Sequence, residues 1–188
     1  MRKNVRGFTI VELLIVIVVI AILAAISVVA YNGIQSRARN TQQLSTAKSY
    51  MDALASYVAI NGSYPSTGGV TRVCLGIEQA DCTTSTAWYR NATIETALKS
   101  IISPLPQAST GTPNTVSPKM AYVPASDITL DGVINPFLIY TIEAPGTCTA
   151  GTPVSGVWPN YTSAVPAQGY TFTEAGGIRV CTIALPRI

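Results

Sequence analysis

The stretch FTIVELLIVIVVIAILAAISVVA, residues 8–30, decides how this chain folds. Residues 13–26 form an unbroken apolar run, and Glu12 is the single charged residue of the whole stretch. As a helix the stretch would span about 35 Å, enough to cross a hydrocarbon core of about 30 Å. A helix also pairs its backbone N–H and C=O groups internally, as lipid requires. The stretch therefore predicts a transmembrane helix.

Basic residues on either side of this stretch predict its orientation. Arg2, Lys3 and Arg6 precede it, whereas only Arg37 and Arg39 follow closely. Because positive charge is retained in the cytoplasm, we expect a cytoplasmic N-terminus and an exported remainder. A removed secretory signal is an alternative, but the apolar run is longer than such signals have. A plain signal anchor is the other alternative, and it has no need for Glu12.

Composition excludes several function classes. The chain has 12 basic and 9 acidic residues, and without the three basic residues of the leader it is formally neutral. It therefore lacks the basic footprint of nucleic-acid-binding proteins. Histidine is absent, which excludes Ser-His-Asp and Cys-His catalysis and histidine zinc sites. No P-loop motif is present either, so we expect neither an enzyme nor a cofactor.

Beyond the apolar stretch the pattern predicts an α+β protein. Residues 31–62 are expected to continue the helix in amphipathic form and to end at Asn61-Gly62. Residues 63–188 are expected to form an exported head with a small antiparallel sheet on which this helix packs. The apolar face of the helix is expected to consist of Ile34, Ala38, Thr41, Leu44, Ala47, Met51, Leu54 and Val58.

Within the head, short runs of β-prone residues alternate with turn residues. Strands are expected near residues 71–75, 120–123, 138–142, 170–173 and 177–184, the last two forming a hairpin. A short helix is expected after Asn91, with Ile94, Leu98 and Ile101 on one face and an end at Ser103-Pro104. Residues 104–118, rich in Pro, Ser, Thr and Gly, are expected to form an exposed loop.

The head also contains four cysteines without the CxxC spacing of a zinc or thioredoxin-like site. An exported head lies in a compartment where disulfides form, and an even count fits two bridges. Three pairings are possible, and pairing of sequence neighbours without crossing favours two of the possible bonds. These are Cys74–Cys82 and Cys148–Cys181.

The N-terminal sequence MRKNVRGFTIVELLIVIVVIAILAAI resembles the class III leader and first helix of type IV prepilins and pseudopilins. The family pattern is a basic leader, Gly, Phe, a polar residue and a Glu at the fifth position after the cut. Gly7, Phe8, Thr9 and Glu12 match it. The resemblance implies that a prepilin peptidase removes residues 1–7 and methylates the Phe8 amine, while residues 8–30 stay as the membrane and filament-core helix.

The resemblance further implies a structural subunit that is stored in the inner membrane and polymerises into a surface pilus for adhesion, twitching motility or DNA uptake. Its partners would be other copies, the peptidase and methyltransferase, an assembly platform with its ATPase, and membrane lipid. Glu12 would neutralise a neighbour's Phe8 amine and set the axial register. Many major pilins carry Gly and Pro where this chain has Ala21 and Val29, which puts local melting of the helix in question.

Other interpretations stay open at this stage. A type II secretion pseudopilin or minor pilin is the nearest alternative, and a single-pass membrane-anchored adhesion or binding module is the alternative from another class. Asp127, Asp131 and Glu143 are weak candidates for calcium ligands, but they lack EF-hand spacing, and a solvated turn is the favoured interpretation.

The Cys148–Cys181 pair resembles the disulfide-bounded C-terminal loop of many major pilins.

Overall fold

The computed structural model describes residues 8–70, 72–76, 82, 89–108, 119–124, 129–130, 133–134, 136–143, 146–148, 170–174 and 177–186. They divide into two compact units, Met1–Ala38 and Arg39–Ile188. Helix α1, Ile10–Asn61, contributes to both units, so the second unit, here called the head, contains the last turns of α1. Residues 1–7, the expected leader with Gly7, lie outside the described residues.

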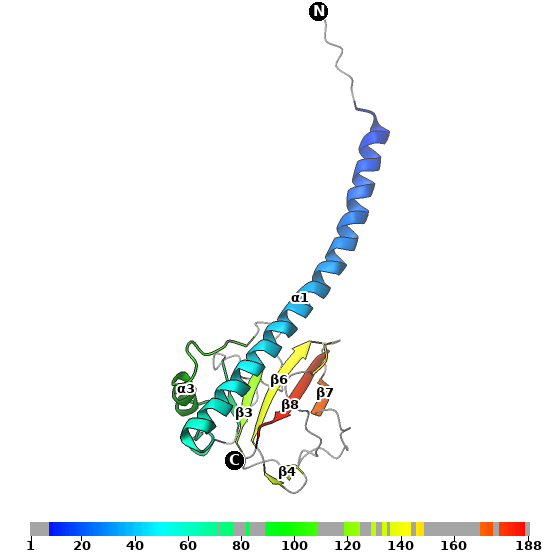
Figure 1. Ribbon diagram of the computed structural model, residues 1–188. Helices are drawn as coiled ribbons and strands as arrows, with labels where there is room; N and C mark the ends of the chain where they lie inside the picture. Colours follow the sequence, from blue (N-terminus) through cyan, green and yellow to red (C-terminus); the bar gives the residue numbers. More distant parts are fainter. Residues whose placement is uncertain are drawn as a thin grey trace, which may run out of the picture. The chain divides into compact units, whose positions relative to one another are not determined.

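The strands of the head, drawn as arrows in Figure 1, lie largely where the sequence predicts them. The α+β class is confirmed, and strands lie at or within a few residues of the five expected positions. The elements after α1 are β1 Val73–Cys74, β2 Tyr89–Arg90, α3 Ala92–Lys99, β3 Met120–Val123, β4 Thr129–Leu130, β5 Val133–Ile134, β6 Phe137–Glu143, β7 Tyr170–Glu174 and β8 Ile178–Ala184.

The sequence predicted an antiparallel sheet, but the main sheet is mixed. Its strand order is β2-β1-β3-β6-β8-β7, and β4 and β5 pair separately. All neighbours in the main sheet are antiparallel except β1 and β2, which pair in parallel through Val73 with Tyr89 and Cys74 with Arg90. Parallel neighbours need a connection of a dozen or more residues, which residues 75–88 supply. Strand β2 has only two residues, too few to show as a pattern in the sequence.

Two helix boundaries that the sequence marks in the head are confirmed. Helix α1 ends at Asn61, where Gly62 adopts a left-handed φ of 71° and its N–H donates to the Val58 carbonyl over 2.7 Å. Helix α3 begins after Asn91, whose side chain accepts hydrogen bonds from the N–H groups of Thr93 and Ile94. Its expected apolar residues Ile94 and Leu98 are buried, but the helix ends at Lys99, before the expected end, so Ile101 lies beyond it and is half-buried.

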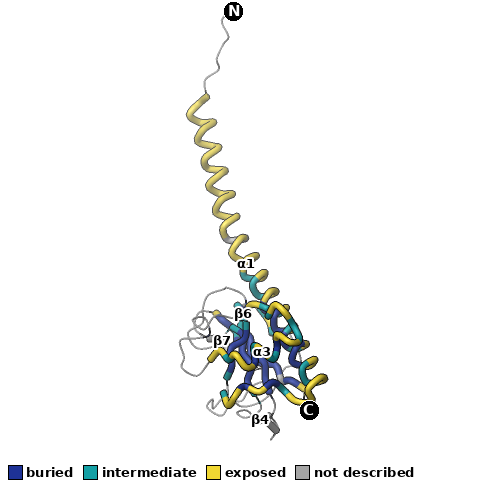
Figure 2. Tube along the Cα trace, turned by 90° about the vertical axis from the view of Figure 1, so that its left-hand side faces the viewer, coloured by how far each residue is buried: buried dark blue, intermediate teal, exposed yellow. Residues whose placement is uncertain are grey.

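The last turns of α1 lie across the sheet, and their buried face differs from the expected one (Figures 1 and 2). Ala47 and Leu54 are buried as expected. Thr41, however, is exposed, and Ile34 and Ala38 in the first unit are exposed as well. Four residues outside the expected face are buried instead, so the face is turned around the helix. They are Gln43, Thr46, Tyr50 and Ala53.

Polar side chains on this buried face are hydrogen-bonded to carbonyl groups of the head. Gln43 Nε2 donates to the Lys119 carbonyl, Thr46 Oγ1 to that of Gln107 over 3.0 Å, and Tyr50 OH to that of Pro106 over 2.9 Å. A buried polar group that is hydrogen-bonded avoids the desolvation penalty, so these residues can replace apolar ones. The expectation that residues 104–118 form an exposed loop was wrong for Ala108, which is buried, and for Pro106, which is half-buried with its carbonyl bound to Tyr50.

Two disulfides cross-link the head in the pairing that sequence proximity favours. Cys74 in β1 is bonded to Cys82, with a sequence separation of 8, and Cys148 is bonded to Cys181 in β8, with a separation of 33. Cys181 is directly opposite Tyr140 of the central strand β6. The second bond therefore ties the segment after β6 back to the strand beside it.

We predict that removing the Cys148–Cys181 bond destabilises the head more than removing Cys74–Cys82. In the chain-entropy model the larger loop restricts the unfolded chain more, and separations of 33 and 8 differ by about 1 kcal/mol. Thermal unfolding of the two double Cys→Ala variants, followed by near-UV circular dichroism in detergent micelles, checks this. Equal or reversed losses would contradict it.

We also predict that the head loses stability above about pH 10 through two buried phenols. Burial raises the pKa of Tyr50 and of Tyr122 above the usual value of about 10. Stability is therefore complete below the unfolded-state pKa and falls as pH rises past it, by up to about 1.4 kcal/mol per pH unit for each tyrosine. Thermal unfolding between pH 8 and 11 should show a shallower decline for Tyr50→Phe than for the unmodified protein. An unchanged slope would exclude Tyr50 as a source.

Candidate functional site

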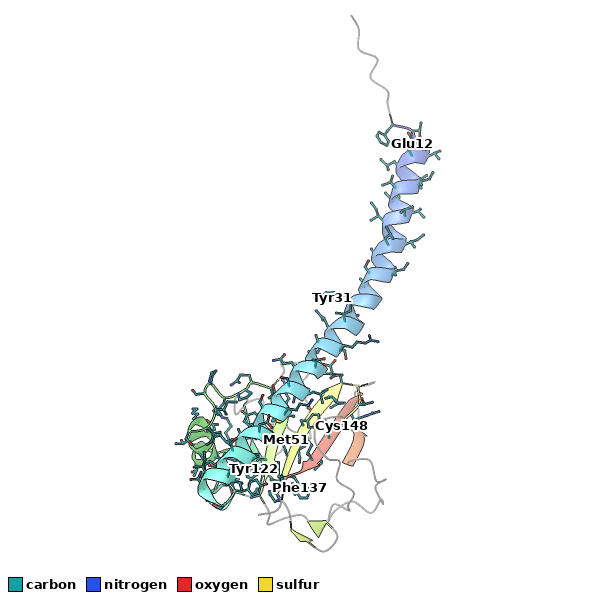
Figure 3. The ribbon with its side chains drawn as sticks, in the orientation of Figure 1. Glu12, Tyr31, Met51, Tyr122, Phe137 and Cys148 are labelled. Atoms are coloured by element: carbon teal, nitrogen blue, oxygen red, sulfur yellow. A yellow bond between two sulfur atoms is a disulfide. The ribbon has the colours of Figure 1, made fainter. Side chains whose placement is uncertain are left out.

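The N-terminus of α1 is organised by Thr9 and Glu12. Glu12 Oε2 accepts hydrogen bonds from the Thr9 N–H and the Thr9 hydroxyl, both over 2.8 Å. In return Thr9 Oγ1 accepts from the Glu12 N–H over 3.2 Å. This reciprocal pair is a capping box, which satisfies N–H groups that a helix start otherwise leaves unpaired. Figure 3 shows Glu12 at this end of the helix.

The capping box uses only one of the two carboxylate oxygens. Among the described residues, no hydrogen bond to Glu12 Oε1 is present beside the two that Oε2 accepts. One oxygen therefore fixes the helix start, and the other is available to a further donor. The spacing Thr-x-x-Glu signals a capping box in the sequence, so this second role of Glu12 could have been found there.

An uncovered apolar surface follows the capping box. Residues 8–28 are all exposed, Phe8 at 82% and Ile20 at 59% (Figure 2). By length and composition α1 could cross a membrane, and none of its most apolar window is buried inside the structure. Soluble monomers rarely expose apolar patches beyond a few hundred Å². The arrangement therefore suits burial in lipid or against other protein surfaces.

The calcium candidates of the sequence do not form a described site. Asp127 and Asp131 lie outside the described residues, and Glu143 is engaged by Arg39 in an ion pair of 2.6 Å. Within the described part of the chain there is no group of three or more His, Cys, Asp or Glu residues that could hold a metal ion.

Sequence reasoning missed the cluster that Glu143 does form. Arg39 Nε and Nη2 donate to the two carboxylate oxygens of Glu143 over 2.6 and 2.7 Å. These bonds raise the pKa of Arg39 above its ordinary value. Asn40 binds the backbone of the same residue, donating to the Glu143 carbonyl and accepting from its N–H, both over 2.8 Å. Partners more than 100 residues apart leave no periodic signal, so nothing in the pattern pointed to this cluster.

Comparison with known proteins links the chain to filament subunits. Residues 2–28 match the family model for the prokaryotic N-terminal methylation motif. A fimbrial protein of Neisseria meningitidis serogroup A / serotype 4A is 36% identical over 61 residues, which cover 32% of this chain and 36% of that protein. The type IV major pilin protein PilE1 of Neisseria gonorrhoeae is 35% identical over 60 residues, covering 32% and 36%.

The chain thus spans about a third of the length of the curated relatives that it matches. No solved structure matches it significantly. The matched motif contains Gly7, Phe8, Thr9 and Glu12, the residues around the capping box. The chain therefore contains a prokaryotic N-terminal methylation motif and is similar to type IV pilin and fimbrial proteins over about a third of its length.

Proposed function

We propose that this protein is a structural subunit of a type IV pilus, which polymerises through its N-terminal helices into a surface filament. One observation carries the proposal: a methylation motif opens a helix whose apolar surface is exposed along residues 8–28. Lipid covers that surface before assembly, and the helices of other copies cover it afterwards. Each subunit then binds other copies of the same chain, as a filament requires.

Processing would precede assembly. The prepilin peptidase cuts between Gly7 and Phe8 on the cytoplasmic side of the inner membrane and methylates the new amine of Phe8. The cut leaves Thr9 and Glu12 in place, so the capping box persists in the mature chain. An assembly platform and its ATPase then extract the subunit, since this chain has no nucleotide-binding motif of its own.

Glu12 supplies the register between subunits. A carboxylate inside an apolar helix costs about 2.5–3.5 kcal/mol on insertion scales, so it calls for a cationic partner. Cleavage creates such a cation at Phe8, near the same end of the helix. In a staggered bundle Glu12 Oε1 receives the amine of a neighbour while Oε2 keeps its bonds to Thr9. One side chain then caps its own helix and marks the position of the next.

The processing step predicts that the mature protein begins at Phe8 with a methylated amine. Mass analysis of the N-terminal peptide from membrane and filament fractions checks this. Arg6→Ala, which changes the leader without touching Gly7 or Phe8, serves as a control for the cut position. A mature chain beginning at Met1, or after Ala25 or Ala30, would refute the prepilin assignment.

The register role predicts that Glu12→Gln is cleaved and accumulates in the membrane but yields at least tenfold fewer sheared filaments. Gln can replace Glu in a capping box but carries no charge, and breaking a buried ion pair costs about 3–5 kcal/mol. The measurement is the ratio of sheared filaments to membrane pool on immunoblots. Glu12→Ala should lose the cap as well and assemble no better.

Thr9→Ala is the matched control for Glu12→Gln, because it removes the capping hydroxyl and keeps the charge. It should retain most of the filament yield. Normal yield from Glu12→Gln together with a loss in Thr9→Ala would assign Glu12 to capping alone. Correctly processed wild-type protein that forms no filament in a competent host would instead support a membrane-anchored module.

A further inference from the structure

The first turns of α1 in the head are held by polar contacts. Buried apolar residues of α1 begin at Ala47, and the partly buried Leu44 is the first to touch the core. Before Leu44, the side chains of Arg39, Asn40 and Gln43 are hydrogen-bonded to other parts of the head. Apolar burial tolerates small shifts, whereas hydrogen bonds depend on distance and angle. Residues 39–42, which lie before the buried Gln43, can therefore separate from the head without opening the core.

Asn40 completes the edge of the central strand. Strand β3 begins at Met120, opposite Tyr140, so β6 extends past it to Glu143. Thr141 still donates to the Lys119 carbonyl over 3.1 Å. Two residues further on, Asn40 occupies the same edge and binds both backbone groups of Glu143, as a neighbouring strand would. The helix side chain takes the place of a strand residue.

The segment after Glu143 is shaped to accept this side chain. A Cβ at Gly146 would lie 2.6 Å from Asn40 Nδ2 and 2.9 Å from the Glu143 carbonyl oxygen, so only glycine fits. The Gly146 N–H donates to that same carbonyl over 2.9 Å. Two residues later, Cys148 is bonded to Cys181 of β8 (Figure 3). The receiving segment is thus tied to two central strands.

We propose that Arg39, Asn40 and Glu143 form a latch that opens as one unit and passes tension along α1 into β6 and, through the disulfide, into β8. Asn40 positions the backbone of Glu143, and Arg39 holds its side chain, so each interaction aligns the other. Opening the latch releases the helix only as far as Gln43, whose buried side chain donates to the Lys119 carbonyl, and apolar contacts follow from Leu44. The mechanical role rests on the proposed pilus function, but the latch itself does not.

Hydrogen exchange of single amides tests whether the latch acts as a unit. The Glu143 N–H is bonded to Asn40 Oδ1, and the Thr141 N–H on the same strand edge is bonded to a backbone carbonyl. In full-length protein in detergent micelles, Arg39→Ala should raise Glu143 exchange about fivefold or more relative to Thr141. Arg39 makes neither of these bonds, so the effect can reach Glu143 only through a cooperative latch.

Two further variants complete the experiment. Gly146→Ala should have the same effect, because its Cβ displaces Asn40. Arg90→Ala is the control, since it breaks a similar pair, Arg90–Glu95 at 2.7 Å, elsewhere in the head. An unchanged ratio of Glu143 to Thr141 exchange in Arg39→Ala would show an independent surface ion pair and overturn the latch. An equal rise at both amides would show general destabilisation and overturn it too.

Filament shear tests the mechanical role separately. Filaments of Arg39→Ala should break into shorter fragments than the wild type under the same shear, whereas Arg90→Ala filaments should match the wild type. Fragments of equal length would overturn the role in carrying tension. If the wild type forms no filaments, the pilus proposal fails, while the exchange result still decides on the latch.

Discussion

The absence of any cover for the first turns of α1 is the constraint on which the rest of this protein depends. Nothing described in the chain shields residues 8–28, so lipid or another protein must do so. The head must therefore pack on the last turns of the same helix and leave its first turns exposed. It does this with a buried apolar face from Leu44 onward and with hydrogen bonds before it.

The sequence revealed those features that arise from neighbouring residues. The end of α1 at Asn61-Gly62 and the start of α3 at Asn91 depend on local backbone chemistry, and both were predicted correctly. Strands long enough to show alternating or continuous β-prone residues were also found. Strand β2 was missed because two residues, Tyr89 and Arg90, carry no period.

Hydrogen bonds between side chains of α1 and distant parts of the head could not be predicted. Gln43, Thr46 and Tyr50 look like the solvent side of an amphipathic helix, and only the carbonyls of residues 106, 107 and 119 make them buried. The apolar pattern therefore placed the buried face at the wrong angle. The candidate site, in contrast, depends on neighbouring residues. Glu12 was recognised as the single charge in an apolar run. Its capping box with Thr9 was not predicted, although the spacing of the two residues signals it.

The Tyr64 side chain joins the segment that follows α1 to the last described residues of the chain. Its hydroxyl donates to the Pro186 carbonyl over 2.6 Å, and its ring lies 6.4 Å from that of Tyr122. Pro186 therefore lies close to the segment that follows α1, and the end of α1 at Asn61 is about 33 Å along the helix axis from Arg39. A fluorophore or affinity tag joined to the C-terminus would therefore start near the end of α1, away from Arg39 and Asn40. Such a label would report on the head without contacting the part of α1 around Arg39.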